Sequence, residues 1–272
     1  MNIHPTAVVD HSAKVPTSCS VGPYCVVGPA AELGDGVRLI AQVHITGVTT
    51  IGEGTVVYPF ASLGTPPQSV HYRGEPTKLV IGPHCQIREG VTMNIGTVAG
   101  GGITRVGARG FFMVSSHVAH DCDVGDGVTF ANNAVIGGHV SIGDNVFLGG
   151  NAAVHQFVRI GEGVMLGGLS GAPTDVIPFS FVFGRIGKLV GLNVVGLRRR
   201  GASRTDLRRL REAYRALFKG EGVFADRIDK VAMAFADDPL VQKVIAFIRA
   251  GGKRPLMHPA LRAAEDGEAD GL

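Results

Sequence analysis

An apolar residue recurs every six positions through the middle of this chain, and this period restricts the possible folds more than any other feature. The register also runs earlier, in residues 15–33, 51–63 and 81–93. A six-residue period is typical of a parallel β-helix, in which three short strands complete one coil and successive coils stack through backbone hydrogen bonds. The unbroken register comprises Val106, Phe112, Val118, Val124, Phe130, Ile136, Ile142, Leu148, Val154, Ile160, Leu166 and Ala172.

The composition agrees with a repetitive, turn-rich fold. The chain of 272 residues contains 40 glycines and no tryptophan, whereas a conventional core relies on bulky side chains. Glycine often follows the periodic apolar residue directly, and we expect these glycines to form tight corners where a positive φ is needed. Cys19, Cys25, Cys85 and Cys122 all occupy a small position of the repeat, which favours buried thiols over a zinc ribbon or a redox motif.

Three repeats complete a coil of eighteen residues, so residues eighteen apart should lie on neighbouring coils, about 4.8 Å apart. The repeat breaks at residues 64–79 and 97–104, which we expect to be loops that leave the corners of the helix. From about Ser203 the apolar spacing becomes helical, and further helices are predicted over residues 223–236 and 239–250. The predicted architecture is mainly β: a parallel β-helix over residues 1–190, then a helical domain over 191–272 whose acidic tail should be disordered.

The charge and hydropathy of the chain exclude several classes of partner. The net charge of +3, from 26 basic and 23 acidic residues, is too small to predict nucleic-acid binding by the chain as a whole. No segment approaches the roughly 20 apolar residues that span a bilayer, and no secretory signal is visible. We therefore expect a cytoplasmic protein without a membrane span.

Titratable side chains gather along one predicted edge of the β-helix. Asp121 is placed to orient His120 as a general base, and the backbone N–H of Gly138, one coil along, is placed to donate to a developing oxyanion. No serine or cysteine nucleophile accompanies them, so direct transfer to an acceptor is the simplest chemistry. In stacked order the edge holds His117 and His120 with Asp121, then Gly138 with His139, then His155 with Gln156.

Two other interpretations of this edge stay open. Histidines on stacked coils bind zinc in the gamma-class carbonic anhydrases, which resemble this chain in scaffold only, and the H-x4-H pair of that family is absent here. The second alternative is a non-catalytic assembly scaffold, which would leave the histidines unexplained. We predict that the protein needs no metal and no cofactor.

A run of nine basic residues follows the repeats. It is either a solvated helix face or an anion site, in which the first three residues bind a diphosphate and the others an acidic protein partner. The run comprises Arg198, Arg199, Arg200, Arg204, Arg208, Arg209, Arg211, Arg215 and Lys219.

Several long segments resemble the UDP-N-acetylglucosamine O-acyltransferase family, whose members catalyse the first step of lipid A biosynthesis. In chain order these segments are YRGEPTK, REGVTMNIGT, HVAHDC, ANNAVIGGHVSIGD, AVHQF, GGLSGAP and GLNVVGLRRRG, and the resemblance covers nearly the whole chain. It implies a left-handed parallel β-helix and a homotrimer with active sites between subunits. It also implies transfer of a 3-hydroxyacyl group from acyl carrier protein to the sugar 3-position of the UDP-amino sugar.

The matched motifs also imply residue roles. His120 would be the general base, Asp121 would orient it, and Gly138 would donate to the oxyanion. Gly168 matches a position where a bulkier residue shortens the acyl pocket in some relatives, so a long acyl chain is expected. The resemblance places His117, His139, His155 and Gln156 in the cleft, and Asn193, Arg199 and Arg200 on the uridine diphosphate.

Three acceptor-facing positions depart from the family pattern, since Ser69 replaces an aspartate, His71 a lysine and Asn94 a histidine. A sugar hydroxyl needs polarisation as it attacks, whereas a neutral amine is already nucleophilic. One hypothesis is therefore an acceptor with a 3-amino group, which some relatives use. The later N-acyltransferase of the same pathway also fits the scaffold, but it normally carries an extra N-terminal domain, whereas the repeats here begin almost at Met1.

Overall fold

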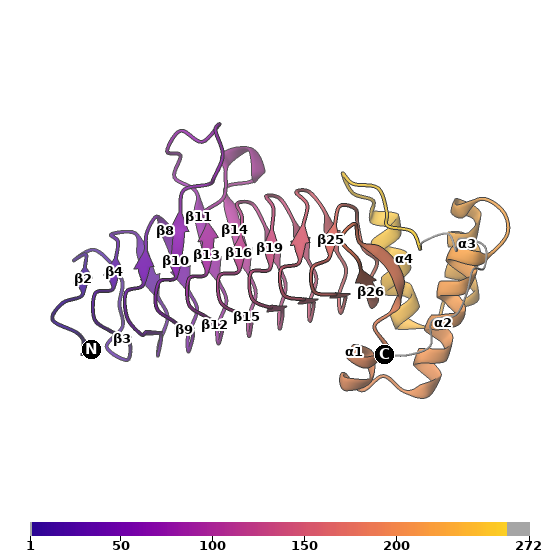
Figure 1. Ribbon diagram of the computed structural model, residues 1–272, viewed down its shortest axis with the longest axis horizontal. Helices are drawn as coiled ribbons and strands as arrows, with labels where there is room; N and C mark the ends of the chain where they lie inside the picture. Colours follow the sequence, from indigo (N-terminus) through magenta and orange to yellow (C-terminus); the bar gives the residue numbers. More distant parts are fainter. Residues whose placement is uncertain (1, 260–272) are drawn as a thin grey trace.

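The structure, a computed structural model, describes residues 2–259 as an elongated three-sided prism that ends in a group of helices (Figure 1). An 11-stranded, a 9-stranded and a 7-stranded sheet form its sides, here called faces 1, 2 and 3. Most strands are two residues long, because each side of a coil is only one repeat wide. The prediction of a parallel β-helix is confirmed.

The strands of each face are neighbours along the prism axis. Face 1 contains β1 (Asn2–Ile3), β3 (Ser20–Val21), β6 (Arg38–Leu39), β9 (Val56–Val57), β12 (Gln86–Ile87), β15 (Phe111–Phe112), β18 (Thr129–Phe130), β21 (Phe147–Leu148), β24 (Met165–Leu166), β26 (Ser180–Phe183) and β27 (Lys188–Leu192). Face 2 contains β2 (Val8–Val9), β4 (Val26–Val27), β7 (His44–Ile45), β10 (Ser62–Thr65), β13 (Thr92–Asn94), β16 (His117–Val118), β19 (Val135–Ile136), β22 (Ala153–Val154) and β25 (Gly171–Ala172). Face 3 contains β5 (Ala31–Leu33), β8 (Val48–Ile51), β11 (Lys78–Ile81), β14 (Ile103–Val106), β17 (Asp123–Val124), β20 (Ser141–Ile142) and β23 (Arg159–Ile160).

The strand register confirms the eighteen-residue winding. His117 of β16 pairs with Val135 of β19, which pairs with Ala153 of β22. Two coils are longer, because one loop runs from β10 to β11 and another, which contains the 3₁₀ helix η1 (Val98–Gly100), runs from β13 to β14. Both loops, predicted from the breaks in the repeat, project from the same side of the prism (Figure 1).

The glycines that follow the periodic apolar residues allow neighbouring coils to approach closely, whereas we expected them to form corners with positive φ. A Cβ atom at Gly149 would lie only 2.4 Å from the backbone nitrogen of Gly168 on the next coil. The expectation of positive φ was wrong for these glycines, because what they permit is the close approach of two coils. Several left-handed corner positions are instead non-glycine residues, including Asp121 (φ 60) and His139 (φ 61). The glycines concerned, all outside the left-handed region, are Gly107, Gly125, Gly137, Gly143, Gly149, Gly161 and Gly167.

The four cysteines behave as small core residues. Each is a free thiol with at most 2% of its surface exposed. Burial raises the pKa of Cys122 to about 12, so this thiol is protonated at neutral pH. The prediction that the cysteines are buried is confirmed.

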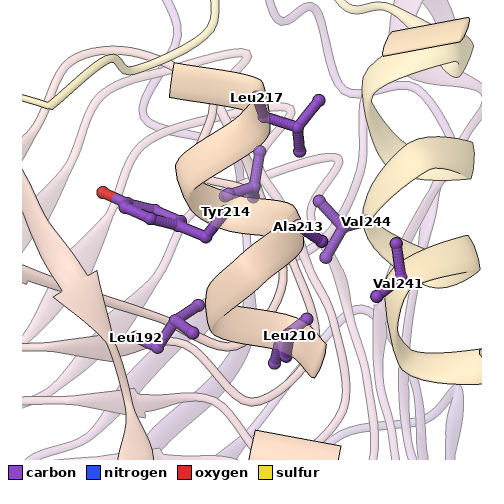
Figure 2. A pocket seen from close by; sticks show the side chains of 8 residues that line it. Leu192, Leu210, Ala213, Tyr214, Leu217, Val241 and Val244 are labelled. Atoms are coloured by element: carbon purple, nitrogen blue, oxygen red, sulfur yellow. The ribbon is translucent and has the colours of Figure 1, made fainter. Parts of the chain in front are cut away.

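Four helices follow the last coil within residues 2–259: α1 (Val194–Arg199), α2 (Arg204–Lys219), α3 (Phe224–Ala234) and α4 (Pro239–Ala250). Ser203 and Asp206 form a capping box at the start of α2. Figure 2 shows Ala213 of α2 pointing toward Val244 of α4. The cavity that these two residues line together with Ile177 and Leu192 has a volume of only about 10 Å³, room for a single water, so its lining is a core and not a ligand site.

None of the helices in this described part of the chain is long and apolar enough to cross a membrane. The acidic tail that was predicted to be disordered lies outside the described residues. The division of the chain into domains at residue 190 stays a prediction.

A buried ion pair joins the helices to the β-helix. Arg159 Nε donates to Asp175 Oδ2 at 2.7 Å, and Asp175 is only 1% exposed. The same guanidinium donates to the carbonyl of Phe247 in α4 at 3.2 Å and lies 4.3 Å from the centroid of its ring. Arg159 therefore links the last coils to α4.

We expect Asp175→Ala to lower the free energy of unfolding by about 3 kcal/mol, because it would leave the Arg159 cation partly buried without its partner. Urea unfolding followed by circular dichroism would measure the loss. Asp123→Ala is the matched control, since Asp123 is exposed on face 3. A loss at Asp175 no larger than at Asp123 would contradict the structural role of this pair.

Candidate active site

His120 and Asp121 turn the chain between β16 on face 2 and β17 on face 3. We call this edge the 2–3 corner; it comprises residues 120–121, 138–139 and 156–157 on three successive coils. His120 Nδ1 lies 2.7 Å from Asp121 Oδ2. The Asp121 side chain is fully buried and that of His120 is 18% exposed. A buried carboxylate thus holds one nitrogen of a partly exposed imidazole, whose Nε2 has no hydrogen-bond partner in residues 2–259.

The second loop fixes the Asp121 carboxylate. The backbone N–H of Thr97 donates to Oδ1 at 2.6 Å, and the Thr97 hydroxyl donates to Oδ2 at 2.7 Å. Burial opposes ionisation of Asp121, but the hydrogen bonds from His120 and Thr97 outweigh it and hold its pKa below the usual value. The carboxylate is therefore ionised at neutral pH. The sequence did not predict a functional role for Thr97, because Thr97 lies where the repeat is broken.

We expect Thr97→Val to lower kcat about ten-fold, because a hydrogen bond to an ionised carboxylate is lost while the side-chain volume is kept. Steady-state kinetics would show the effect in kcat with KM nearly unchanged. Thr92→Val is the matched control, since the Thr92 hydroxyl bonds His117 on the same face. Equal effects of the two substitutions would contradict a specific role for Thr97.

The next coil places Gly138 and His139 against the His120 ring. A Cβ atom on Gly138 would lie 2.6 Å from His120 Cε1, so only glycine leaves room for the imidazole. Gly138 is a buried residue, and in the described part of the chain its N–H donates to no other group. His139 meets His120 edge to face, with 5.1 Å between ring centroids, and its Nε2 lies 3.6 Å from Asp121 Oδ2.

A pocket of about 410 Å³ lies between this corner and the two loops. Ser69 and His71 of the first loop lie in its wall, as the sequence interpretation expects of acceptor-facing residues. A volume of this size suits a small ligand. The remaining lining residues are Tyr72, Glu75, Thr97, Val98, Ala99, His120 and His139.

The third coil extends the corner toward the helices. Phe157 stacks on His139, with 4.5 Å between the ring centroids and 8° between their planes. His155 and Gln156 are exposed and contact Arg254, whose side chain donates to the Gln156 carbonyl at 3.0 Å. The stacking predicted by eighteen-residue arithmetic is therefore present at His120, Gly138 and Gln156.

The chain is similar to known acyltransferases over nearly its whole length. A curated relative from Azorhizobium caulinodans is 58% identical over 95% of both chains, and one from Caulobacter vibrioides is 55% identical over 95% of this chain and 98% of its own. Both are named acyl-[acyl-carrier-protein]–UDP-N-acetylglucosamine O-acyltransferase. This chain belongs to the UDP-N-acetylglucosamine O-acyltransferase family.

Two further comparisons bear on the fold and the helices. The family model described as UDP N-acetylglucosamine O-acyltransferase, domain 2, matches residues 175–257. The crystal structure of the UDP-N-acetylglucosamine O-acyltransferase from Moraxella catarrhalis superposes with a TM-score of 0.92 and 40% identity, covering 95% of this chain and all of the other. The expected left-handed parallel β-helix is thereby confirmed.

Other residues matched to the family lie at different corners of the prism. Gly168 is on the corner between faces 1 and 2, where a Cβ atom would find its nearest neighbour 3.4 Å away. Asn193 caps α1 and donates to the carbonyl of Gly163, on the corner between faces 3 and 1. Arg199 and Arg200 follow in and just after α1. A single chain therefore does not bring these residues to His120.

Two predicted site residues are held within face 2. Asn94 is only 2% exposed, and its amide donates to the Thr65 hydroxyl at 2.9 Å and to the Pro66 carbonyl at 3.1 Å. It anchors the start of the first loop and does not line the pocket. The expectation that Asn94 faces the acceptor is therefore not met in this structure. His117 is on the same coil as His120, and its Nδ1 lies 2.7 Å from the hydroxyl of Thr92 on the preceding coil.

The corner also contains a possible set of metal ligands. Ligand atoms of His120, Asp121 and His139 lie within 4.8 Å of one another. However, the Asp121 oxygens already accept three hydrogen bonds, from His120 Nδ1 and from the backbone and hydroxyl of Thr97, so the carboxylate has little capacity left for zinc. The donor set fits zinc poorly, and metal analysis of the purified protein would test the alternative directly.

Acidification should destabilise the fold through His117, because burial lowers the pKa of this imidazole. Below an ordinary histidine pKa of about 6.5, the unfolded chain takes up a proton that the folded chain resists. The free energy of unfolding should therefore fall as the pH drops from 7 to 5, and His117→Asn should weaken this dependence. Urea unfolding at several pH values would measure it. His11→Asn, at a side chain 97% exposed, should leave the dependence unchanged, and equal slopes for both variants would contradict the prediction.

Proposed function

We propose that this chain transfers a long 3-hydroxyacyl chain from an acyl carrier protein to the 3-position of UDP-N-acetylglucosamine. The observation that carries the proposal is the ionised, buried Asp121 that holds His120 directly over Gly138. The names of relatives up to 58% identical supply the two substrates. This reaction is the first step of lipid A biosynthesis.

The geometry suggests how the acyl group would move. Asp121 accepts from His120 Nδ1, which leaves Nε2 to take the proton of the 3-hydroxyl as its oxygen attacks the thioester carbonyl. The Gly138 N–H then donates to the oxyanion of the tetrahedral intermediate. When the carbon–sulfur bond breaks, the imidazolium returns the proton to the departing thiolate. The reaction balances without a metal or a cofactor.

The carrier protein would dock on α2. Five cations, spaced three or four residues apart, are exposed along this helix. Acyl carrier proteins are acidic, so such a row would attract them and its effect would weaken in salt. Arg209 is not part of the row, because it is half-buried and pairs with Asp237 and Asp238, whereas Arg208 is exposed and has only a long 4.0 Å contact with Glu212. The row comprises Arg204, Arg208, Arg211, Arg215 and Lys219.

A homotrimer would complete the site. Gly168, Asn193, Arg199 and Arg200 lie away from His120 within one chain, so a neighbouring subunit must supply them if they contact the same substrates. Large apolar side chains are exposed on face 2 and on its corner with face 1, among them Phe60 and Leu169, the latter 72% exposed. Light scattering should give three times the 28.4 kDa mass of the chain, and a monomer at working concentration would contradict the trimer.

One assay tests the function and the acceptor together. The purified enzyme is incubated with acyl carrier proteins that carry 3-hydroxyacyl chains of different lengths, and with either UDP-N-acetylglucosamine or its 3-amino analogue. Mass spectrometry reads the products. We expect transfer to the 3-hydroxyl sugar with long chains preferred, and absence of transfer to both sugars would refute the proposal. Faster transfer to the amine would favour the N-acylation alternative, for which the neutral Ser69 in the pocket wall is the supporting feature.

A further inference from the structure

The segment after α4, residues 251–259, returns to the β-helix and is fixed there. The Asp175 N–H donates to the Pro255 carbonyl at 2.9 Å, and the Met257 N–H donates to the Asp175 carbonyl at 2.7 Å. Met257 is only 4% exposed. Figure 1 shows this yellow segment turning back from α4 beside the last coils. Residues 251–259 are therefore packed and hydrogen-bonded against the last coils of the β-helix.

Gly252 allows this approach. A Cβ atom there would lie 2.4 Å from Asp175 Oδ2 and 2.6 Å from Arg159 Nε, inside the buried ion pair. The segment thus crosses the pair at a distance that only glycine permits. The close approach at Gly252 therefore positions the next two residues, Lys253 and Arg254, against the β-helix.

Lys253 and Arg254 lie beside the third coil of the 2–3 corner, at residues 155–157. Lys253 Nζ lies 4.5 Å from the centroid of the Phe157 ring, which also stacks on His139. Arg254 lies 2.9 Å from His155 Nδ1 and donates to the Gln156 carbonyl. Two cations therefore flank the third coil, and within residues 2–259 no carboxylate lies within 4.0 Å of either.

We propose that Lys253 and Arg254 form a phosphate-binding subsite at the helical end of the 2–3 corner, two coils from the general base. The inference rests on the proposed function, because both substrates of that reaction carry phosphate esters. The sugar nucleotide has a diphosphate, and the prosthetic arm of the carrier protein is attached through a phosphodiester. Lys253 is exposed and Arg254 is half-buried, so their donors can reach a ligand that spans roughly 10 Å from the His120 coil.

Lys253→Gln tests the subsite, because it removes the charge of an exposed side chain and keeps most of its length. We expect KM to rise about ten-fold for one substrate, with kcat within about two-fold of the wild-type value. Varying the sugar nucleotide at saturating acyl carrier protein, and then the reverse, identifies which phosphate is bound. Lys253→Arg should restore the wild-type KM. Lys230→Gln on α3 makes the same charge change away from the corner.

Binding measurements separate this inference from the proposed function. Calorimetry with UDP alone, and with the unacylated carrier protein alone, reports the phosphate contact without turnover. If the wild-type enzyme transfers acyl groups and Lys253→Gln matches Lys230→Gln for both substrates, the subsite is refuted and the function stands. If the wild-type enzyme transfers nothing but Lys253→Gln still weakens binding of one probe, the function is refuted and the subsite stands.

Discussion

His120→Ala is expected to lower kcat by about 100-fold to 10,000-fold, with the fold intact. The side chain is 18% exposed and bonds the buried Asp121 carboxylate, so thermal melting of the same preparation must show that the variant is folded under the assay conditions. What disappears is the Nε2 that would take the proton of the acceptor hydroxyl. Single-turnover kinetics with radiolabelled acyl carrier protein would isolate the chemical step from substrate binding.

His84→Ala is the matched control for this experiment. His84 also sits at a corner beside a carboxylate, since its Nε2 lies 3.7 Å from Glu53 Oε1, but it is on a different edge of the prism. Its substitution should leave kcat within about two-fold of the wild-type value. Retention of a third or more of the wild-type rate by His120→Ala would remove His120 as the general base.

Gly138→Ala should cost at least about 100-fold in kcat, although it adds a single methyl group. The new Cβ would lie 2.6 Å from His120 Cε1 and 2.7 Å from Nε2, so the imidazole would have to leave its position. The ring would then lose its alignment with Asp121 and its place beside the N–H that is proposed to bind the oxyanion. Activity assays and thermal melting on the same preparation would separate this loss from unfolding.

Gly150→Ala is an appropriate control, because Gly150 occupies the equivalent turn on the corner between faces 1 and 2. A Cβ atom there would find its nearest neighbour, the Asn132 carbonyl, at an ordinary 3.6 Å. We expect near wild-type activity from this variant. Comparable activity of the two alanine variants would show that the contact between His120 and Gly138 is not needed for catalysis.

The column of residues at the 2–3 corner was predictable because the winding is regular. Once three repeats make a coil, the position of Gly138 under His120 follows from counting eighteen residues. The cysteines were predictable for the same reason, since their place in the repeat points inward. The helices α2 and α4 lie where helical spacing was expected, and α3 ends at Ala234, two residues before the expected end.

The parts that counting missed are those where the chain leaves the repeat. Thr97 reaches Asp121 because a loop replaces a regular turn, and no periodicity predicts the course of a loop. The antiparallel pair β26 and β27 and the short helix α1 follow the last regular coil and were not predicted. Arg254 meets His155 across 99 residues of sequence, a contact that depends on how the helices fold back.

The stacked construction also sets how this enzyme could be retuned. Adding or removing one coil moves all residues on one side of it along the prism axis by about 4.8 Å. The arrangement of side chains at each end of the prism is kept. The distance between the proposed proton acceptor, His120, and the cations of Lys253 and Arg254 therefore changes only in whole steps of one coil. A substrate of different length is accommodated by inserting or deleting a whole layer, whereas intermediate spans require changes in the loops.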